Sequence, residues 1–450
     1  MKRPSRKIAF RILYLAFGIR LVGCLIRAFG EIVEPHVWRQ TDTLGMSLRY
    51  WLRFIHEPFN WKLLLPAVLQ SGDGNGILPV EFPFLNFIFS PAWALGPYWG
   101  KVVIYVLLSL LIFYICKKIS ETKHWLSPAF LLLPFLSISA DYIEKFIPDT
   151  LATLLVSYGA LLFIKDRRKW ALALVTLGIL MKPTSIVALG ILFLFSKFRK
   201  RFVSNSLFFA LPTVVGLIYY TVGLKWIDHF RQGDVLIFLV AARNPIQSLH
   251  EIFSNLPFVL GAFQNRVFFV WGGLFVLLCL AFLRLKPKLR ILGGLCGLLF
   301  LQFTVIAALD GGHSAQHDYY YMGMAPIAAA VVWLCLRKGR PALSALLLTI
   351  LFLHSVELSA QNLNPKKLTG FFRSRQECSM LKQRNPMVPW NQDYVFRSRT
   401  EPFPALGLCF GEREGSKTSN FGIYFKTDTV PDECRTIDQT EQFKLVKCGG

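Results

Sequence analysis

Residues 102–116 read VVIYVLLSLLIFYIC, an unbroken apolar run that ends directly before Lys117 and Lys118. This run, bounded by Lys101 and Lys117, approaches the ~20 residues that an α-helix needs to cross the hydrocarbon core of a bilayer. Similar runs recur at residues 151–164, 207–224, 267–283, 291–309, 321–336 and 342–356. Since a helix in lipid satisfies its own backbone polar groups, these runs predict a polytopic α-helical membrane protein.

The placement of charge predicts the topology. The chain has 450 residues, 54% of them hydrophobic, and a formal net charge of +23. Its basic residues gather between the apolar runs, at residues 2–7, 117–123, 165–169, 197–201, 284–290 and 337–340. Cytoplasmic loops carry such an excess of Lys and Arg, so we expect a cytoplasmic N-terminus and no nucleic-acid partner.

Two regions are predicted from this pattern. Residues 1–358 form a transmembrane domain of about 11 membrane helices, with a retained first helix over about 8–29 and a long, Trp-rich first outer loop over 31–101. Residues 359–450 form a small extracytoplasmic domain. It carries Cys378, Cys409, Cys434 and Cys448, which predict two disulfides with three connectivities open.

Lys182 and Pro183 interrupt the apolar stretch between the basic clusters at 165–169 and 197–201. Because both flanks carry the charge of cytoplasmic loops, the stretch is predicted to be a hairpin of two short helices with Lys182 near its tip. Backbone breaks at membrane depth occur where they are buried in protein or line a cavity.

The few acidic residues of the predicted membrane domain gather in loops of one side. The first outer loop offers Glu34, Asp42 and Glu81, and the second offers Asp149 directly after Pro148. The loop before residue 321 adds a third group, Asp310, His313, His317 and Asp318. We therefore expect a site at the extracytoplasmic boundary of the membrane.

These loops resemble those of bacterial GT-C glycosyltransferases, the group of the protein O-mannosyltransferases and the lipid A aminoarabinose transferase. The resemblance rests on five short motifs between Pro35 and Pro326: HVWRQTDT at 36–43 with SLRY at 47–50, EFP at 81–83, IPDTL at 147–151, MKP at 181–183 and HDYYY at 317–321. The better-known relatives carry an Asp-Glu pair in the first loop, and an alignment on Leu48-Arg49 places their Asp over Gln40. The base assignment therefore stays open to a shift of two or three positions.

The resemblance implies an inverting, metal-independent transferase of the bacterial inner membrane that needs no cofactor. It would move a sugar from a polyprenyl-phosphate donor to an extracytoplasmic acceptor, a lipid or glycan in preference to a protein. Asp42 would be the general base and Asp149 a second carboxylate. The substrate-binding residues would be Arg39, Gln40, Glu81, Lys182, His317 and Tyr320.

The chemistry needs a carboxylate to take the acceptor proton and cations to stabilise the departing phosphate. Each candidate also has a structural interpretation. Asp42 could cap a helix starting at Thr43, and Asp149 could complement a helix dipole. Lys182 could extend to the outer interface, and Arg39 could pair with Glu34.

His313 and His317 have a spacing that could ligate a metal, although the adjacent glycines argue against it.

Two other classes of function remain open. An oligosaccharide polymerase or ligase would also be polytopic and outward-facing, but we expect it to rely on Arg and His, so Asp42→Asn separates it from the transferase. A lipid-linked-sugar transporter would show paired broken helices or repeat symmetry, and the sequence has one break.

Overall fold

The computed structural model describes residues 6–30, 37–56, 65–66, 81–122, 127–135, 142–143, 145–194, 202–230, 318–338, 341–362, 377, 380–381, 383–385, 394–396, 421–425, 430, 432, 434–440 and 443–448. These residues are mostly helical. The chain divides into two compact units. The first contains Met1–Cys24, Leu108–Tyr220 and Phe238–Gln361, and the second contains Leu25–Leu107, Thr221–Ile237 and Asn362–Gly450.

The helices follow the apolar runs of the sequence. The α-helices are α1 (Arg6–Arg27), α2 (Val37–His56), α3 (Phe84–Phe89), α4 (Gly96–Ser120), α6 (Pro148–Ile164), α7 (Arg168–Met181), α9 (Phe202–Ile218), α10 (Leu224–Asp228), α15 (Ala325–Lys338) and α16 (Pro341–Asn362). Between them lie the 3₁₀ helices η2 (Ser90–Leu95), η3 (Ser127–Phe135), η4 (Pro183–Leu194) and η7 (Asp318–Met324), and a π-helical turn, η5 (Tyr219–Gly223).

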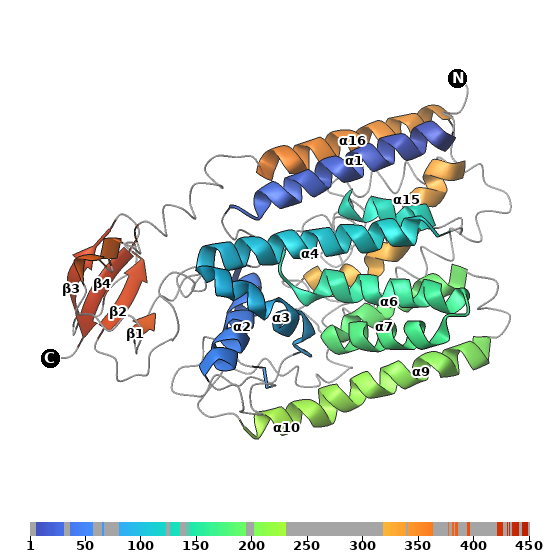
Figure 1. Cartoon of the computed structure of the whole chain (residues 1–450). Coiled ribbons are helices and arrows are strands. Elements are labelled where there is room, and N and C mark those ends of the chain that lie inside the picture. The colour runs from blue at the N-terminus through green and yellow to red at the C-terminus, as the bar shows by residue number, and fades with distance from the viewer. Residues whose placement is uncertain are drawn as a thin grey trace, which may run out of the picture. The chain divides into compact units, whose positions relative to one another are not determined.

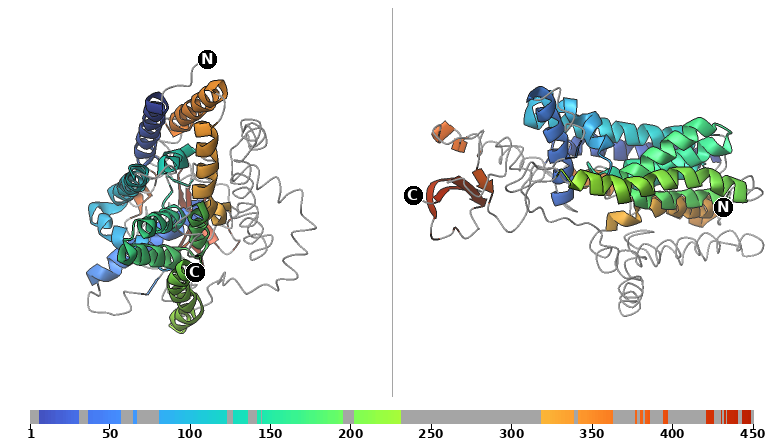
Figure 2. Two further views of the ribbon diagram at one scale, coloured as in Figure 1. Left: turned by 90° about the vertical axis from the view of Figure 1, so that its right-hand side faces the viewer. Right: turned by 90° about the horizontal axis from the view of Figure 1, so that it is seen from below.

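The helices of the first unit alternate in direction. α6 and α7 lie side by side and antiparallel, and α16 lies beside α1 and runs in the same direction, with Ser359 Oγ donating to the carbonyl of Ile19 (Figure 1). In both views of Figure 2, α9 lies beside α7. The basic segments that begin α1, end α4, join α6 to α7 and end α15 therefore gather at one end of the unit (Figure 1).

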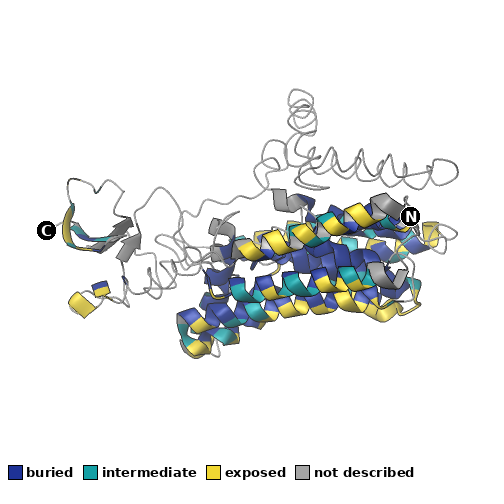
Figure 3. Ribbon diagram, turned by 90° about the horizontal axis from the view of Figure 1, so that it is seen from above, coloured by how far each residue is buried: buried dark blue, intermediate teal, exposed yellow. Residues whose placement is uncertain are grey.

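Two stretches of the described residues, Tyr98–Ser120 and Phe202–Asp228, are helical, long and apolar enough to cross a membrane. Their outward faces differ from those of soluble helices, because large apolar side chains stay exposed on α9, among them Val203, Leu207 and Leu217. Figure 3 shows this contrast between the exposed outer helix faces and the buried interior. The prediction of a mostly helical protein is confirmed, and two of its helices are candidate membrane spans among the described residues.

Polar side chains hold α2 in the second unit. The amide nitrogen of Asn86 in α3 donates to the carbonyl of Thr43 at 2.7 Å, and the indole of Trp93 in η2 donates to Ser47 Oγ at 3.1 Å. Gly96, with φ of 81°, turns the chain from η2 into α4, a conformation that glycine adopts at little cost. The predicted long outer loop thus contains helices of its own.

The C-terminal region forms a four-stranded sheet, with β1 (Tyr394–Phe396), β2 (Phe421–Phe425), β3 (Cys434–Gln439) and β4 (Phe443–Cys448) in the order β1-β2-β4-β3. β1 and β2 are parallel, whereas β4 pairs antiparallel with β2 and β3. The register of the last pair places Cys434 opposite Cys448. Leu445 and Val446 of β4 are buried.

One structural interpretation of Asp42 is wrong. Because α2 begins at Val37, Asp42 lies inside this helix and does not cap a helix that starts at Thr43. Several other predictions concern residues outside the described ranges: the runs at 267–283 and 291–309, most of a further large outer loop expected at 225–265, and Cys378 and Cys409.

Candidate functional site

A helix break places Lys182. α7 ends at Met181, and Lys182 follows in an extended conformation, with φ of −156° and ψ of 113°. Pro183 explains the break, because its ring disfavours helical geometry in the preceding residue and it has no N–H to continue the helix. The chain then continues as η4, which packs against both α6 and α7. The predicted interruption at Lys182 is confirmed.

Side-chain hydroxyls bond two carbonyls near the end of α7, although that of Gly178 also accepts the N–H of Lys182. The last turn of a helix has carbonyls without an intrahelical partner. Ser185 Oγ donates to the carbonyl of Gly178 at 3.0 Å, and the phenol of Tyr220 donates to the carbonyl of Leu180 at 2.7 Å. The end of α7 is therefore fixed from two directions, and this holds Lys182 in place.

Asp149 lies at the start of α6. Ile147 precedes the helix in an extended conformation, Pro148 occupies its first position and Asp149 lies in its first turn. The fixed φ of proline suits the first position of a helix, and a carboxylate in the first turn complements the positive end of the helix dipole. Lys182 at the end of α7 complements the negative end of the neighbouring dipole in the same way.

The antiparallel packing of α6 and α7 brings these two charges together. Lys182 Nζ lies 3.6 Å from Asp149 Oδ1, and the two side chains are 3% and 1% exposed, respectively. Removing two charges from water is expensive unless they are paired, and the pairing must then be close. The result is a buried ion pair at the end of α6 and α7 opposite their basic connection.

Glycines set the spacing between α6 and α7. A Cβ on Gly178 would lie 2.8 Å from the carbonyl oxygen of Ala152, and a Cβ on Gly159 would lie 2.7 Å from a methyl of Val175. The two helices approach so closely only because both positions lack a side chain. The ion pair depends on this approach.

A third element closes on the same region. η7 packs against η4 and α6, and a Cβ on its Gly323 would lie 2.6 Å from the carbonyl oxygen of Thr184. This segment carries Tyr320, one of the predicted substrate-binding residues, although its side chain lies outside the described part. The first unit thus brings together the segments that bear Asp149, Lys182 and Tyr320.

The second unit holds another buried cation. Lys101, which is 1% exposed, donates to the carbonyl of Gly30, and its ammonium lies 5.8 Å from the ring centroids of both Tyr98 and Tyr105. The phenol of Tyr105 donates to the amide oxygen of Gln40 at 3.0 Å. Gln40 is therefore held by α4 through Tyr105.

The predicted residues divide accordingly. Asp149 and Lys182 form the pair, Gln40 belongs to the Lys101 cluster, and Glu81 is half-buried just before α3. The backbones of Arg39 and Asp42 lie in α2. Their side chains and the whole of His317 are outside the part of the chain that the structure describes. Sequence reasoning missed Lys101, which the spacing of Tyr98, Lys101 and Tyr105 on one helix face would have indicated.

Comparisons with models of protein families, with curated proteins and with solved structures found no match to this chain.

Proposed function

We propose that this protein is a GT-C-type glycosyltransferase, moving a sugar from a polyprenyl-phosphate donor to an extracytoplasmic lipid or glycan acceptor. The observation that carries the proposal is the buried pair of Asp149 and Lys182 at a helix break. Ionisable residues within membrane segments are costly and usually mark a functional pathway. This pair coincides with two of the motifs, IPDTL and MKP, on which the resemblance to GT-C enzymes rests.

The roles follow from the charge of each group. Lys182 takes the phosphate of the donor, and Asp149 is its counter-ion while the site is empty. When Lys182 binds the phosphate, the carboxylate of Asp149 is available to hold the acceptor. Such a cation stabilises the negative charge that develops on the departing phosphate.

The reaction has one bond-breaking and one bond-forming event. The anomeric C–O bond to the phosphate breaks as the acceptor oxygen attacks the anomeric carbon from the opposite face, which inverts its configuration. The acceptor proton passes to a carboxylate, for which Asp42 is the candidate from the sequence. No metal ion is required, because polyprenyl phosphate is already a good leaving group.

The topology of the proposal places this chemistry outside the cytoplasm. The basic helix ends of the first unit gather at one end and the Asp149–Lys182 pair lies at the other. By the positive-inside rule the basic end faces the cytoplasm. About 11 membrane helices in a bacterial inner membrane and an extracytoplasmic C-terminal domain complete the proposed arrangement.

A donor assay tests the function. The protein in lipid nanodiscs is given a panel of undecaprenyl-phosphate sugars with an extract of envelope lipids and glycans, and released undecaprenyl phosphate is measured. We expect acceptor-dependent release that falls about 100-fold or more in Lys182→Gln, as for other removed charge-stabilising groups. Lys117→Gln, at an exposed lysine, is the control and should retain full release. No release from any donor, or equal release from Lys182→Gln, would contradict the proposal.

A transporter is the second candidate, because discontinuous helices also line transporter sites. The same nanodisc assay separates the two. A transporter leaves the bond between sugar and phosphate intact, so no undecaprenyl phosphate would be released. Movement of the intact donor across the membrane of liposomes would support a transporter.

A further inference from the structure

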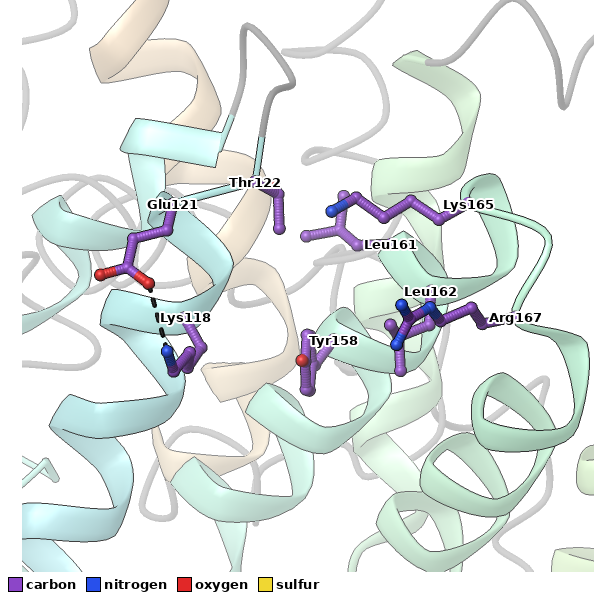
Figure 4. A pocket seen from close by; sticks show the side chains of 8 residues that line it. All are labelled: Lys118, Glu121, Thr122, Tyr158, Leu161, Leu162, Lys165 and Arg167. Carbon is purple, nitrogen blue, oxygen red and sulfur yellow. Dashed lines mark hydrogen bonds and ion pairs between the residues drawn. The ribbon is translucent and has the colours of Figure 1, made fainter.

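A second polar site lies at the basic end of the first unit. A cavity of about 190 Å³ opens between the end of α4, the end of α6 and the turn into α7. Figure 4 shows the side chains that line it: Lys118, Glu121, Thr122, Tyr158, Leu161, Leu162, Lys165 and Arg167. Lys165 lies 16 residues after Asp149 on the same helix, about 24 Å at 1.5 Å per residue, so this cavity is separate from the buried pair.

The lining of the cavity carries an excess of positive charge. Of its three cations, Lys118 comes from the end of α4, and Lys165 and Arg167 come from the turn between α6 and α7. Its one carboxylate, Glu121, is engaged by Lys118 at 3.4 Å. Lys165, Arg167 and Tyr158 form no side-chain hydrogen bond or ion pair with any other described residue. Thr122 exchanges a hydrogen bond with Ser127. The two cations and the phenol are therefore available to a ligand.

The geometry of these donors suits a phosphate group. A guanidinium presents a planar fork of N–H groups that matches phosphate oxygens, and an ammonium adds a mobile point charge. The cavity has room for a phosphate, which has five heavy atoms. Its floor is apolar, since Leu161 and Leu162 are buried.

An apolar stripe leads along α4 to this cavity. Leu110, Leu111 and Tyr114 are 42%, 37% and 57% exposed, and they lie on the helix face that continues to Lys118. The ammonium of Lys118 lies 5.5 Å from the ring centroid of Tyr114. An acyl chain could pack along this stripe while the phosphate binds the cations at its end. A free phosphate ion would make no use of the apolar surface, so the stripe favours a lipid.

We propose that the cavity between α4, α6 and α7 binds the phosphate of an anionic phospholipid, with an acyl chain along the stripe of Leu110, Leu111 and Tyr114. Basic pockets between helices on the cytoplasmic side of membrane proteins bind lipid headgroups by this chemistry. The proposal uses the membrane location proposed above but does not depend on transferase activity.

Lipid binding to the purified full-length protein in detergent tests the site. Native mass spectrometry compares dioleoyl phosphatidylglycerol with zwitterionic dioleoyl phosphatidylcholine, and inorganic phosphate is added as a competitor. The test variant is Lys165→Gln with Arg167→Gln. The matched control, Arg168→Gln with Lys169→Gln, removes the same charge from exposed neighbours that do not line the cavity.

Phosphatidylglycerol should bind the wild type at least about tenfold more tightly than phosphatidylcholine, because each charge-assisted hydrogen bond lost contributes about tenfold. The test variant should lose this preference while the control keeps it. Unchanged melting temperatures without lipid would show that both variants fold.

Three results would overturn the proposal. Equal loss in both double variants would indicate diffuse surface charge. Equal affinity for the two lipids would remove the role of the cations, and displacement of the lipid by millimolar inorganic phosphate would identify a free-anion site. Because the readout is binding, failure here leaves the transferase assay unaffected.

Discussion

Two residues at the break of α7 have a structural role, and we propose that they also bind substrate. Lys182 and Asp149 complete the dipoles of two antiparallel helices and form a buried pair. If the pair had only a structural role, apolar side chains could replace it with little loss of stability or activity. If the pair binds phosphate, the same replacement would abolish activity. Stability and activity measurements on the same variants therefore separate the two roles.

Lys182→Met and Asp149→Leu should each lower the free energy of unfolding by about 3–5 kcal/mol, because each leaves one buried charge without its partner. The double variant should recover at least half of this loss, since apolar replacement of a whole buried pair is often neutral. Reversible unfolding in detergent measures all three. We expect the double variant to be stable yet inactive.

Lys117→Met provides the control for this cycle. Its ammonium lies 3.9 Å from Glu121 and is largely exposed, so its loss should change stability by no more than about 1 kcal/mol. If the losses of the two single variants simply add in the double variant, the two charges do not interact as the structure places them.

The sequence predicted the positions of Lys182 and Asp149 at helix ends, but it did not predict the ion pair between them. Pro183 marks the break and Pro148 marks the start of a helix, so both positions could be derived from local rules. The ion pair between them depends on the close crossing of α6 and α7, and no local rule gives that crossing. For Lys182 we expected a phosphate as the partner, and the structure places Asp149 beside it.

At the scale of elements, glycines decide how closely α6 and α7 pack. Gly178→Ala should destabilise the protein by about 1–3 kcal/mol, the usual cost of forcing an extra carbon into a filled interior, because its Cβ would lie 2.8 Å from a backbone oxygen. It should also reduce donor release by separating Lys182 from Asp149. Thermal unfolding and the donor assay measure the two effects.

Gly18→Ala is the matched control in α1. No heavy atom lies within 4 Å of the Cβ that it would add, so the change should be neutral or stabilise the helix by up to about 1 kcal/mol. If Gly18→Ala and Gly178→Ala had the same effect, general helix propensity would explain the result and close packing would not.

The pairing of β3 with β4 predicts a disulfide between Cys434 and Cys448, which lie opposite each other in the register. A cross-link that closes a loop of this length contributes about 3 kcal/mol. Peptide mapping of the unreduced protein after alkylation should find the two cysteines joined. Recovery of both as alkylated free thiols would contradict the prediction.

The C-terminal sheet also marks a limit of sequence reasoning. Four cysteines allowed three connectivities, and the order β1-β2-β4-β3 rests on pairings between distant strands that periodicity does not encode. The apolar runs of α4 and α9 were predictable because their length alone distinguishes them. The partly amphipathic, Trp-rich pattern of residues 31–101 indicated helices at the membrane surface but not where they begin and end.

At the scale of the molecule, charge is unevenly distributed along the first unit. The basic ends of α1, α4, α6 and α15 lie together, and the buried pair lies at the other end of the same unit. This polarity links the two proposals, because the positive-inside rule would then place the proposed phospholipid cavity on the cytoplasmic side and the proposed transferase site on the opposite side.

Reporter fusions test this polarity. Green fluorescent protein fused after Lys169 should fluoresce, because the turn between α6 and α7 carries the positive charge of a cytoplasmic loop. Alkaline phosphatase fused after Gly450 should be active, because the C-terminal domain is proposed to lie outside. If both positions report the same side, the proposed orientation is wrong.

Chelation tests the proposed metal-independent chemistry. Donor release should be unchanged in excess EDTA, because cationic side chains stabilise the departing phosphate. If release were lost and then restored by Mg²⁺ or Mn²⁺, the carboxylates and His317 would have to be reassigned as metal ligands.

The most direct test of the central claim is an experimental density map of the protein with undecaprenyl phosphate bound. We predict that the phosphate lies within hydrogen-bonding distance of Lys182 Nζ, at the end of α7, and that Asp149 is displaced from its resting contact with Lys182. A map in which the lipid phosphate lies elsewhere while Lys182 remains against Asp149 would contradict it.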